Sequence, residues 1–208
     1  MKFIIIGKRS NLTLHLNKKI EVLKIFSSDD VLSGITHEYL NKFNGSNPWS
    51  IWINFGIAGS SSDCYGELFL IDKITQASTG ACFYPGSVIK SNLKKAEVLT
   101  VDKPQFDYSN VDLIDMEAAE FVRVTSKLSK RDLIVVMKVV SDGPRNSVDS
   151  LSGVRVSELI SRNVSCIVEH IEKMVSLVSA EKKLSRLPPN YNYVVNKWHF
   201  SVSQQNQL

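Results

Sequence analysis

The sequence predicts an α/β fold in which a single domain has a mixed central β-sheet flanked by helices. Short apolar runs that end at turn residues alternate with longer stretches whose apolar residues recur at helical spacing. With 208 residues, of which 43% are hydrophobic and 22% charged, the chain has the size and composition of one globular domain. We expect this domain to span residues 1–185 and residues 186–208 to form an irregular tail.

The first half of the chain is predicted to supply most of the strands. Residues 3–6 and 51–55 are compact apolar runs that lead into Gly7 and Gly56, which is typical of buried strands that enter a turn. Further strands are expected at 21–26, 68–71, 74–77 and 97–101, a helix at 31–43, and a loop at 79–93.

The second half is predicted to contain the main helices and the central strand. In residues 133–140, seven of the eight side chains are apolar, which suits a strand covered on both faces. Helices are expected on either side of this strand, at 115–128 and 157–184. The turn residues after Val140 end the strand, and Pro188 and Pro189 stop the long helix.

Composition argues against several classes of protein. The formal net charge of +4 comes with short, scattered basic pairs rather than one stripe, so no nucleic-acid partner is expected. Three cysteines without CxxC spacing indicate neither a disulfide framework nor a zinc site, and fit a reducing compartment. No apolar run is long enough for a signal peptide core or a membrane span, so we expect a cytoplasmic protein without a membrane partner.

Three short motifs stand at element boundaries and carry candidate chemistry. Residues 54–60 place two glycines after a buried strand, which lets a ligand approach the backbone closely; the alternative is a tight turn. Residues 115–119 contain Glu117, which is either a ligand-binding carboxylate or a solvated acid in the first turn of a helix. Asp142 ends an apolar strand, where a partly buried carboxyl with a raised pKa would carry a proton near neutral pH; the alternative is an Asp that opens a turn.

Together, the order and wording of the three motifs resemble the nucleoside phosphorylase superfamily, especially its nucleosidase branch, which hydrolyses methylthioadenosine and S-adenosylhomocysteine. The resemblance covers roughly residues 1–180, and the 25 residues from Glu117 to Asp142 fit one helix and one strand. It implies a nucleoside phosphorylase-like domain over residues 1–185. It also implies that Asp142 protonates the purine ring, and that Ser141 and Phe106 lie at the base. The residues implied at the ribose are Ile57, Ala58, Gly59, Met116 and Glu117.

The sequence departs from the family pattern near the N-terminus. Nucleosidases carry acidic residues after the glycine of the first strand, one of which activates water, whereas Gly7 is followed here by Lys8 and Arg9. Phosphorylases of the superfamily hold phosphate with basic residues near that turn, so Lys8 and Arg9 are candidate phosphate ligands, or simply an exposed pair. Residues 27–34 have acids in place of the usual glycine-rich loop, and these would repel phosphate.

These features lead to one main interpretation and two alternatives. The main one is cleavage of the N-glycosidic bond of a purine-type nucleoside by water or inorganic phosphate, without a metal or an organic cofactor. The first alternative is a diverged, non-catalytic protein of the same fold that binds or senses a nucleoside. The second, a generic α/β domain, requires three ordered coincidences. The resemblance also implies a homo-oligomer, and we expect a homodimer whose ligand is a small nucleoside.

Overall fold

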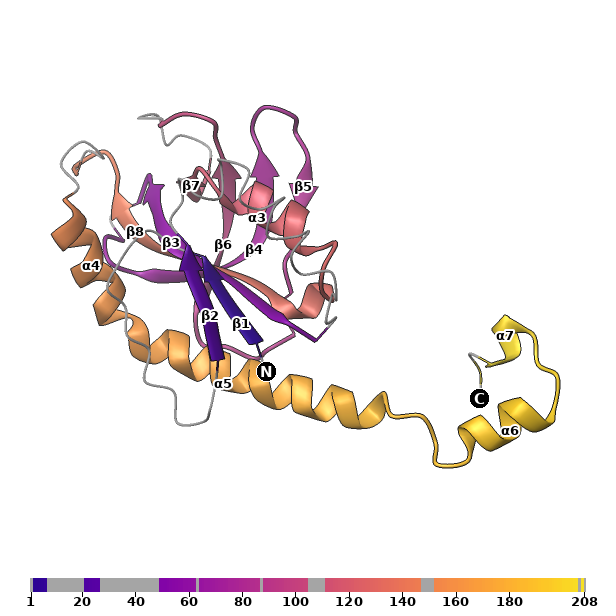
Figure 1. The fold of residues 1–208 in the computed structure, drawn as a ribbon. Coiled ribbons are helices and arrows are strands. Elements are labelled where there is room, and N and C mark those ends of the chain that lie inside the picture. The colour runs from indigo at the N-terminus through magenta and orange to yellow at the C-terminus, as the bar shows by residue number, and fades with distance from the viewer. Residues whose placement is uncertain are drawn as a thin grey trace. The chain divides into compact units, whose positions relative to one another are not determined.

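The strands of the chain assemble into one mixed sheet, which confirms the predicted α/β class (Figure 1). The computed structural model describes residues 2–6, 21–26, 49–62, 64–86, 88–104, 111–146, 152–205 and 207, of which 2–6 and 21–26 by their backbone alone. The described strands are β1 Lys2–Ile6, β2 Glu21–Phe26, β3 Ile51–Ser60, β4 Leu68–Gln76, β5 Cys82–Phe83, β6 Lys94–Thr100, β7 Leu113–Asp115 and β8 Ile134–Asp142.

Five of these strands pair in a closed ring. Strand β3 runs parallel to β8, β8 antiparallel to β4, β4 parallel to β6, β6 parallel to β7, and β7 antiparallel to the end of β3. The pairing β1–β3 extends the sheet outward, with β2 beyond β1, and both contacts are parallel. Strand β3 can join both parts because it is ten residues long: its first half pairs with β1 and its last two residues with β7.

The strands of the ring and helix α3 (Ala118–Thr125) share one hydrophobic core. This helix contacts β3, β4, β5, β6 and β8, and all of its apolar side chains are buried. The buried members of the core are Trp52, Ala58, Ile71, Ile74, Ala96, Val98, Leu113, Ala118, Ala119, Phe121, Val122, Ile134, Val136 and Val140. A core with members from five strands and one helix fixes the positions of the carboxyl ends of β3, β7 and β8.

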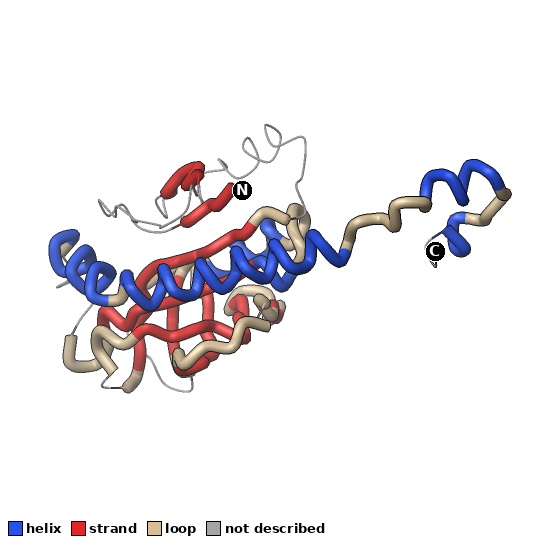
Figure 2. The backbone as a smooth tube through the Cα atoms, turned by 90° about the horizontal axis from the view of Figure 1, so that it is seen from below, coloured by secondary structure: helices blue, strands red, loops and turns tan. Residues whose placement is uncertain are grey.

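Helices α4 (Gly153–Arg162) and α5 (Val164–Leu184) run along the sheet on the side opposite α3 as far as Met174, as Figures 1 and 2 show. The sequence predicted one helix over 157–184, but the structure divides it at Asn163. The Asn163 side-chain amide donates to the carbonyl of Leu159 (2.9 Å) and to that of Gly66 (3.2 Å). A side chain that bonds backbone carbonyls in this way competes with the helical pattern, which explains the break.

Other differences from the sequence prediction concern element boundaries. The expected strands at 68–71 and 74–77 are one continuous strand, β4, and the expected loop at 79–93 includes the two residues of β5. The expected helix at 115–128 begins only at Ala118, because residues 113–115 form strand β7 instead. A 3-10 turn, Arg131–Leu133, leads into β8. The expected helix at 31–43 lies outside the described residues.

The chain forms two compact units, Met1–Met174 and Val175–Leu208. The second unit contains the end of α5 and two short helices, α6 (Tyr191–Lys197) and α7 (Val202–Gln205), where the sequence predicted irregular structure. Within this unit, the Tyr191 hydroxyl donates to the carbonyl of Gln205 (3.1 Å), whose own side-chain amide donates to the carbonyl of Phe200 (3.1 Å). These bonds connect the two short helices.

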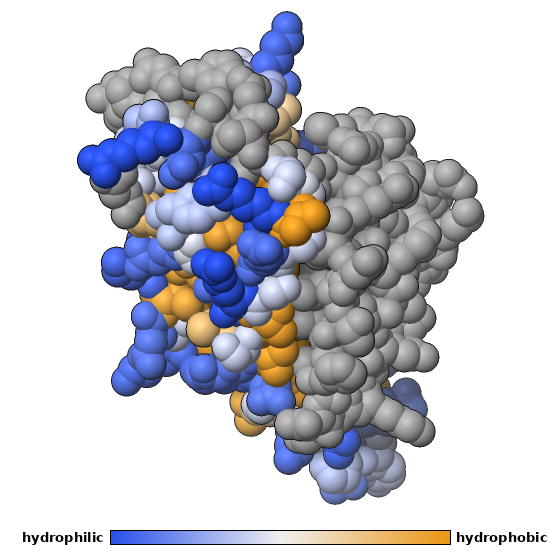
Figure 3. Space-filling view, turned by 90° about the vertical axis from the view of Figure 1, so that its left-hand side faces the viewer, coloured by the Kyte–Doolittle hydropathy of each residue, from blue (hydrophilic) through white to orange (hydrophobic). Residues whose placement is uncertain are grey.

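Hydrophobic side chains on the surface and the apolar character of the helices bear on possible partners. On the side drawn in Figure 3, hydrophobic side chains reach the surface in several places among hydrophilic ones. No helix in the described part of the chain is long and apolar enough to cross a membrane. The homodimer stays a prediction.

A buried histidine makes the stability of the fold depend on pH. Burial of His170 in α5 lowers its pKa from 6.5 to about 4, and the nearby Lys173 adds to the effect. Between pH 4 and 6.5, His170 binds a proton in the unfolded chain but not in the folded chain. The free energy of unfolding is therefore highest above pH 6.5 and falls as the pH drops toward 4. We expect a loss on the order of 3 kcal/mol across this window, measured as the free energy of unfolding in urea.

The variant His170→Leu serves as the comparison. Its free energy of unfolding should lack this part of the pH dependence, since leucine has no proton to bind. Equal slopes for the two proteins between pH 4 and 6.5 would contradict the assignment.

Candidate functional site

The three sequence motifs meet at the carboxyl ends of β3 and β8. Gly59 of β3 pairs with Asp142 of β8 on one edge and with Ile114 of β7 on the other. Met116 and Glu117 follow β7 directly. The turn expected after Phe55 does not form, because β3 continues through both glycines to Ser60. The structure places the glycine-containing end of β3, the Met–Glu pair and the Ser–Asp pair side by side. Ligands of α/β sheets bind outside such strand ends.

Asp142 is held at the end of β8 by its neighbours. It is 9% exposed, and the Ser141 hydroxyl donates a hydrogen bond to its Oδ1. Ser141 is fully buried and its Oγ lies 3.4 Å from the carbonyl oxygen of Ala58 in β3. The backbone at Gly143 passes so close to β3 that a Cβ there would lie 2.4 Å from the carbonyl oxygen of Ser60. These contacts fix the Asp142 carboxyl relative to the glycine-containing end of β3.

Met116 and Glu117 lie between β7 and α3. Met116 is half-buried against a small apolar cluster formed by Val101 and Ile114 with Leu99 and Val111. Glu117 occupies the N-cap position of α3, but its side chain makes no capping bond. Its carboxylate, 18% exposed, is therefore available to another partner.

That partner is a buried lysine that the sequence motifs did not include. The Lys138 ammonium lies 3.9 Å from Glu117 Oε2 and 2.7 Å from Asp115 Oδ2. The side chains of Lys138 and Asp115 are only 1% and 2% exposed. The sequence did contain the signal, because Lys138 is the single charged residue in the otherwise apolar run 133–140. A buried charge of this kind requires a partner.

Asp115 connects four elements of the fold. Its Oδ1 accepts a hydrogen bond from the Thr100 hydroxyl of β6 (2.7 Å), and its Oδ2 accepts one from the backbone N–H of Ala118 (3.0 Å). The Thr100 oxygen in turn accepts from the N–H of Ala119 (3.1 Å). The first free N–H groups of α3 are thus satisfied by side chains of β6 and β7. With the Lys138 bond, Asp115 ties β6, β7, α3 and β8 together.

Gly56 brings the backbone of β3 close to these charges. A Cβ at this position would lie 3.4 Å from the Lys138 ammonium and 3.9 Å from Glu117 Oε2. Strand alternation puts Asn54 on the same face of β3 as Gly56. Asn54 is fully buried, and neither polar atom of its side chain has a hydrogen-bond partner within the described structure. A buried amide without partners is costly, so this face of β3 is suited to a polar guest.

Three other predicted residues cannot be placed. Phe106, expected at the base, and Lys8 and Arg9, the candidate phosphate ligands, lie outside the described residues. Within the described part of the chain, no group of three or more His, Cys, Asp or Glu side chains could hold a metal ion.

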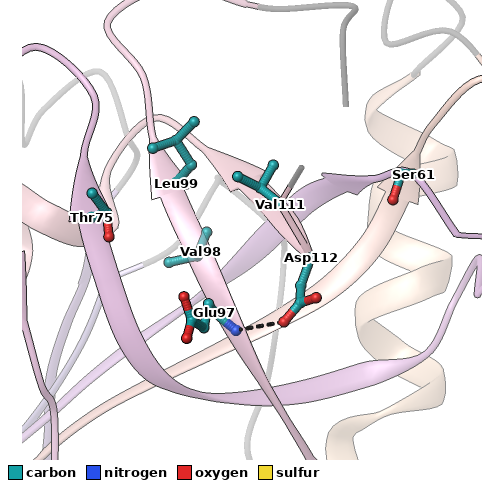
Figure 4. A pocket seen from close by; sticks show the side chains of 7 residues that line it. All are labelled: Ser61, Thr75, Glu97, Val98, Leu99, Val111 and Asp112. Carbon is teal, nitrogen blue, oxygen red and sulfur yellow. Dashed lines mark hydrogen bonds between the residues drawn. The ribbon is translucent and has the colours of Figure 1, made fainter. Parts of the chain in front are cut away.

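A cavity of about 550 Å³ opens beside β6 and β7 (Figure 4). Its lining consists of Ser61, Thr75, Glu97, Val98, Leu99, Val111 and Asp112. Inside it, Asp112 Oδ2 accepts a hydrogen bond from the backbone N–H of Glu97 (3.1 Å). None of the predicted site residues lines this cavity. Leu99 and Val111 link it to the cluster that supports Met116.

Comparison with solved structures shows which known folds the chain resembles. A 5'-methylthioadenosine/S-adenosylhomocysteine nucleosidase from Campylobacter jejuni matches 83% of this chain and 99% of its own, with a TM-score of 0.60 and 16% identity. The chain has the fold of that nucleosidase. The Helicobacter pylori enzyme of the same name matches 84% of this chain and 97% of its own, with a TM-score of 0.53 and 14% identity.

An enzyme of another name shows the same likeness. A futalosine hydrolase mutant from Helicobacter pylori matches 84% of this chain and 98% of its own, with a TM-score of 0.52 and 12% identity. No model of a protein family matches the sequence. No curated protein matches it either. The nucleosidase fold implied by the sequence resemblance is therefore confirmed through structure.

The buried ion pair predicts a large loss of stability when one partner is removed. Lys138→Met should lower the free energy of unfolding by about 3–5 kcal/mol, because the Asp115 carboxylate would remain buried without its partner. The double variant Asp115→Asn, Lys138→Met should recover part of this loss. Urea unfolding of the single and double variants measures both effects.

A surface pair with the same geometry provides the control. Lys73 and Glu97 are also 2.7 Å apart, but their side chains are 33% and 55% exposed. Lys73→Met should therefore cost no more than about 1 kcal/mol. Equal losses for Lys73→Met and Lys138→Met would show that burial does not govern the Lys138 pair.

Proposed function

We propose that the protein cleaves the N-glycosidic bond of a purine-type nucleoside. The observation that carries the proposal is the pairing of Gly59 with both Ile114 and Asp142, which joins the three motifs in a chain with the nucleosidase fold. The structural neighbours are named as enzymes that act on methylthioadenosine, S-adenosylhomocysteine or futalosine. All three are nucleoside derivatives.

The proposed reaction assigns a role to each residue of the site. Asp142 donates a proton to the leaving base, and Ser141 orients its carboxyl. Glu117 accepts hydrogen bonds from the ribose hydroxyls, and Met116 packs against the sugar. The backbone of residues 57–59 lies along the ribose. Loss of the base leaves positive charge on the sugar, which a nearby carboxylate stabilises.

Lys138 acts as a positioning residue in this scheme. Its ammonium is shared between Asp115, at 2.7 Å, and Glu117, at 3.9 Å. Since Asp115 is fixed by Thr100 and by the start of α3, the lysine limits where the Glu117 carboxylate can lie. A carboxylate in one fixed orientation binds two hydroxyls better than a free one.

One feature favours a second candidate function, nucleoside binding without catalysis. Gly7 is followed by Lys8 and Arg9, with no acid to activate water. A diverged protein of this kind would retain the ribose and base contacts and lack turnover. If the protein is instead a phosphorylase, Lys8 and Arg9 are the candidate ligands for inorganic phosphate.

The proposal predicts release of a free base from purine nucleosides or methylthioadenosine, measured by chromatography with and without phosphate. Asp142→Asn should lower the rate by about 10²–10⁴-fold, as expected when a general acid is removed. Glu117→Gln should lower it by about 10²–10³-fold, as expected for a lost electrostatic contact in the transition state. Release only with phosphate would assign the reaction to a phosphorylase.

A second carboxylate on α3 provides the matched control. Glu120 pairs with Arg123 on the surface, so Glu120→Gln should leave the rate unchanged. Absence of turnover, together with a rise in melting temperature when a nucleoside is added, would favour the binding protein. Absence of both would overturn the proposal.

A further inference from the structure

The C-terminal segment of residues 182–208 holds the entire net charge of the chain. It contains four basic residues, Lys182, Lys183, Arg186 and Lys197, and no Asp or Glu. The formal net charge of the whole chain is also +4, so residues 1–181 contain equal numbers of basic and acidic residues. The C-terminal segment therefore attracts anions, and the rest of the chain has no net attraction for them.

The same segment exposes aromatic and aliphatic side chains. Tyr193 is 62% exposed and Trp198 50%, and none of the residues in α6 and α7 is buried. Leu184, Leu187 and Val202 are between 61% and 86% exposed. Burying side chains of this size against water releases free energy, so a surface of this kind indicates a partner.

Lys197 joins the charge to the aromatic rings. Its ammonium lies 5.2 Å from the centre of the Tyr193 ring and 4.8 Å from that of Trp198, and donates to the Tyr193 hydroxyl (2.9 Å). The two rings meet edge to face, 6.4 Å apart. Trp and Tyr beside lysine are the side chains that proteins place at the boundary between lipid headgroups and acyl chains.

We propose that residues 182–208, shown in yellow in Figure 1, bind the surface of an anionic phospholipid membrane. The basic residues attract the headgroups, and Tyr193, Trp198 and the exposed aliphatic side chains enter the interface. Four basic residues combined with exposed aromatic groups suffice for such binding. The segment adheres to the surface without spanning it. The sequence analysis predicted no membrane partner, because no apolar run is long enough to span a bilayer. A short apolar run excludes a membrane-spanning segment, but it does not exclude binding to the membrane surface.

Two other partners fit the segment less well. A second copy of the chain offers no net complementary charge, since its residues 1–181 are neutral overall and its C-terminal segment is equally basic. A single-stranded nucleic acid would use the rings for stacking, but it would leave Leu184, Leu187 and Val202 without a role. Phospholipid accounts for the charge, the rings and the aliphatic side chains together.

The test is co-sedimentation of the full chain with vesicles of phosphatidylcholine, with and without phosphatidylserine. We expect binding only with phosphatidylserine, weakened by salt. Since each basic residue near an anionic surface is worth about fivefold in affinity, the triple variant Lys182→Ala, Lys183→Ala, Arg186→Ala should bind about 100-fold more weakly. Trp198→Phe should remove the blue shift of tryptophan fluorescence that the vesicles cause.

A matched variant controls for the loss of charge. This control removes two lysines and one arginine, as the first triple variant does, but from exposed positions in residues 1–174: Lys95→Ala, Lys127→Ala, Arg162→Ala. It should bind vesicles as the natural chain does. Equal losses for the two triple variants would overturn the proposal, as would absence of binding at low salt. Binding of single-stranded RNA without vesicle binding, or dimerisation that depends on Trp198 in ultracentrifugation, would assign the segment to those partners instead.

Discussion

Asp115 and Lys138 form an ion pair almost without contact with water, and the arrangement of the site depends on it. Burying two charges costs more free energy than most side-chain contacts provide. Such pairs are therefore stable only when further hydrogen bonds satisfy the charged groups. The Thr100 hydroxyl and the N–H of Ala118 supply these bonds. Because the four groups come from β6, α3, β7 and β8, these bonds can form only when the three strands and α3 have assembled.

This requirement places the candidate catalytic side chains. The N–H of Ala118 bonds to Asp115, so α3 begins directly above β7, and Glu117 must lie at that junction. Strand β8 continues past Lys138 to Asp142, where pairing with Gly59 brings the second carboxyl to the same edge of the sheet. The positions of Glu117 and Asp142 thus follow from strand register and helix start. Lys138 connects the two carboxylates, since it lies on the same strand as Asp142 and its ammonium is 3.9 Å from Glu117.

The sequence predicted the parts of the fold whose signal is local. The apolar run ending in Asp142 was identified as a central strand. The glycines after Phe55 were expected to end the preceding strand, but β3 continues through them to Ser60. What could not be predicted depends on contacts between distant residues. Asp115 was assigned to a helix and strand β7 was missed, because three residues carry too little periodicity to show pairing with β3 and β6. Lys138 stands out in the sequence as a lone charge in an apolar run, but its partner could not be predicted, because Asp115 is 23 positions away in the sequence.

The charges around Gly56 bear on the choice of nucleophile. With all three groups ionised, Asp115, Glu117 and Lys138 together carry one net negative charge, which suits a sugar that becomes positive as the base leaves. The same charge repels a phosphate anion, unless cations such as Lys8 and Arg9 outweigh it at close range. A neutral water molecule is not repelled in this way. For the proposed reaction, the buried cluster therefore favours water as the nucleophile, and a phosphorylase on this scaffold would need both basic residues after Gly7 at the site.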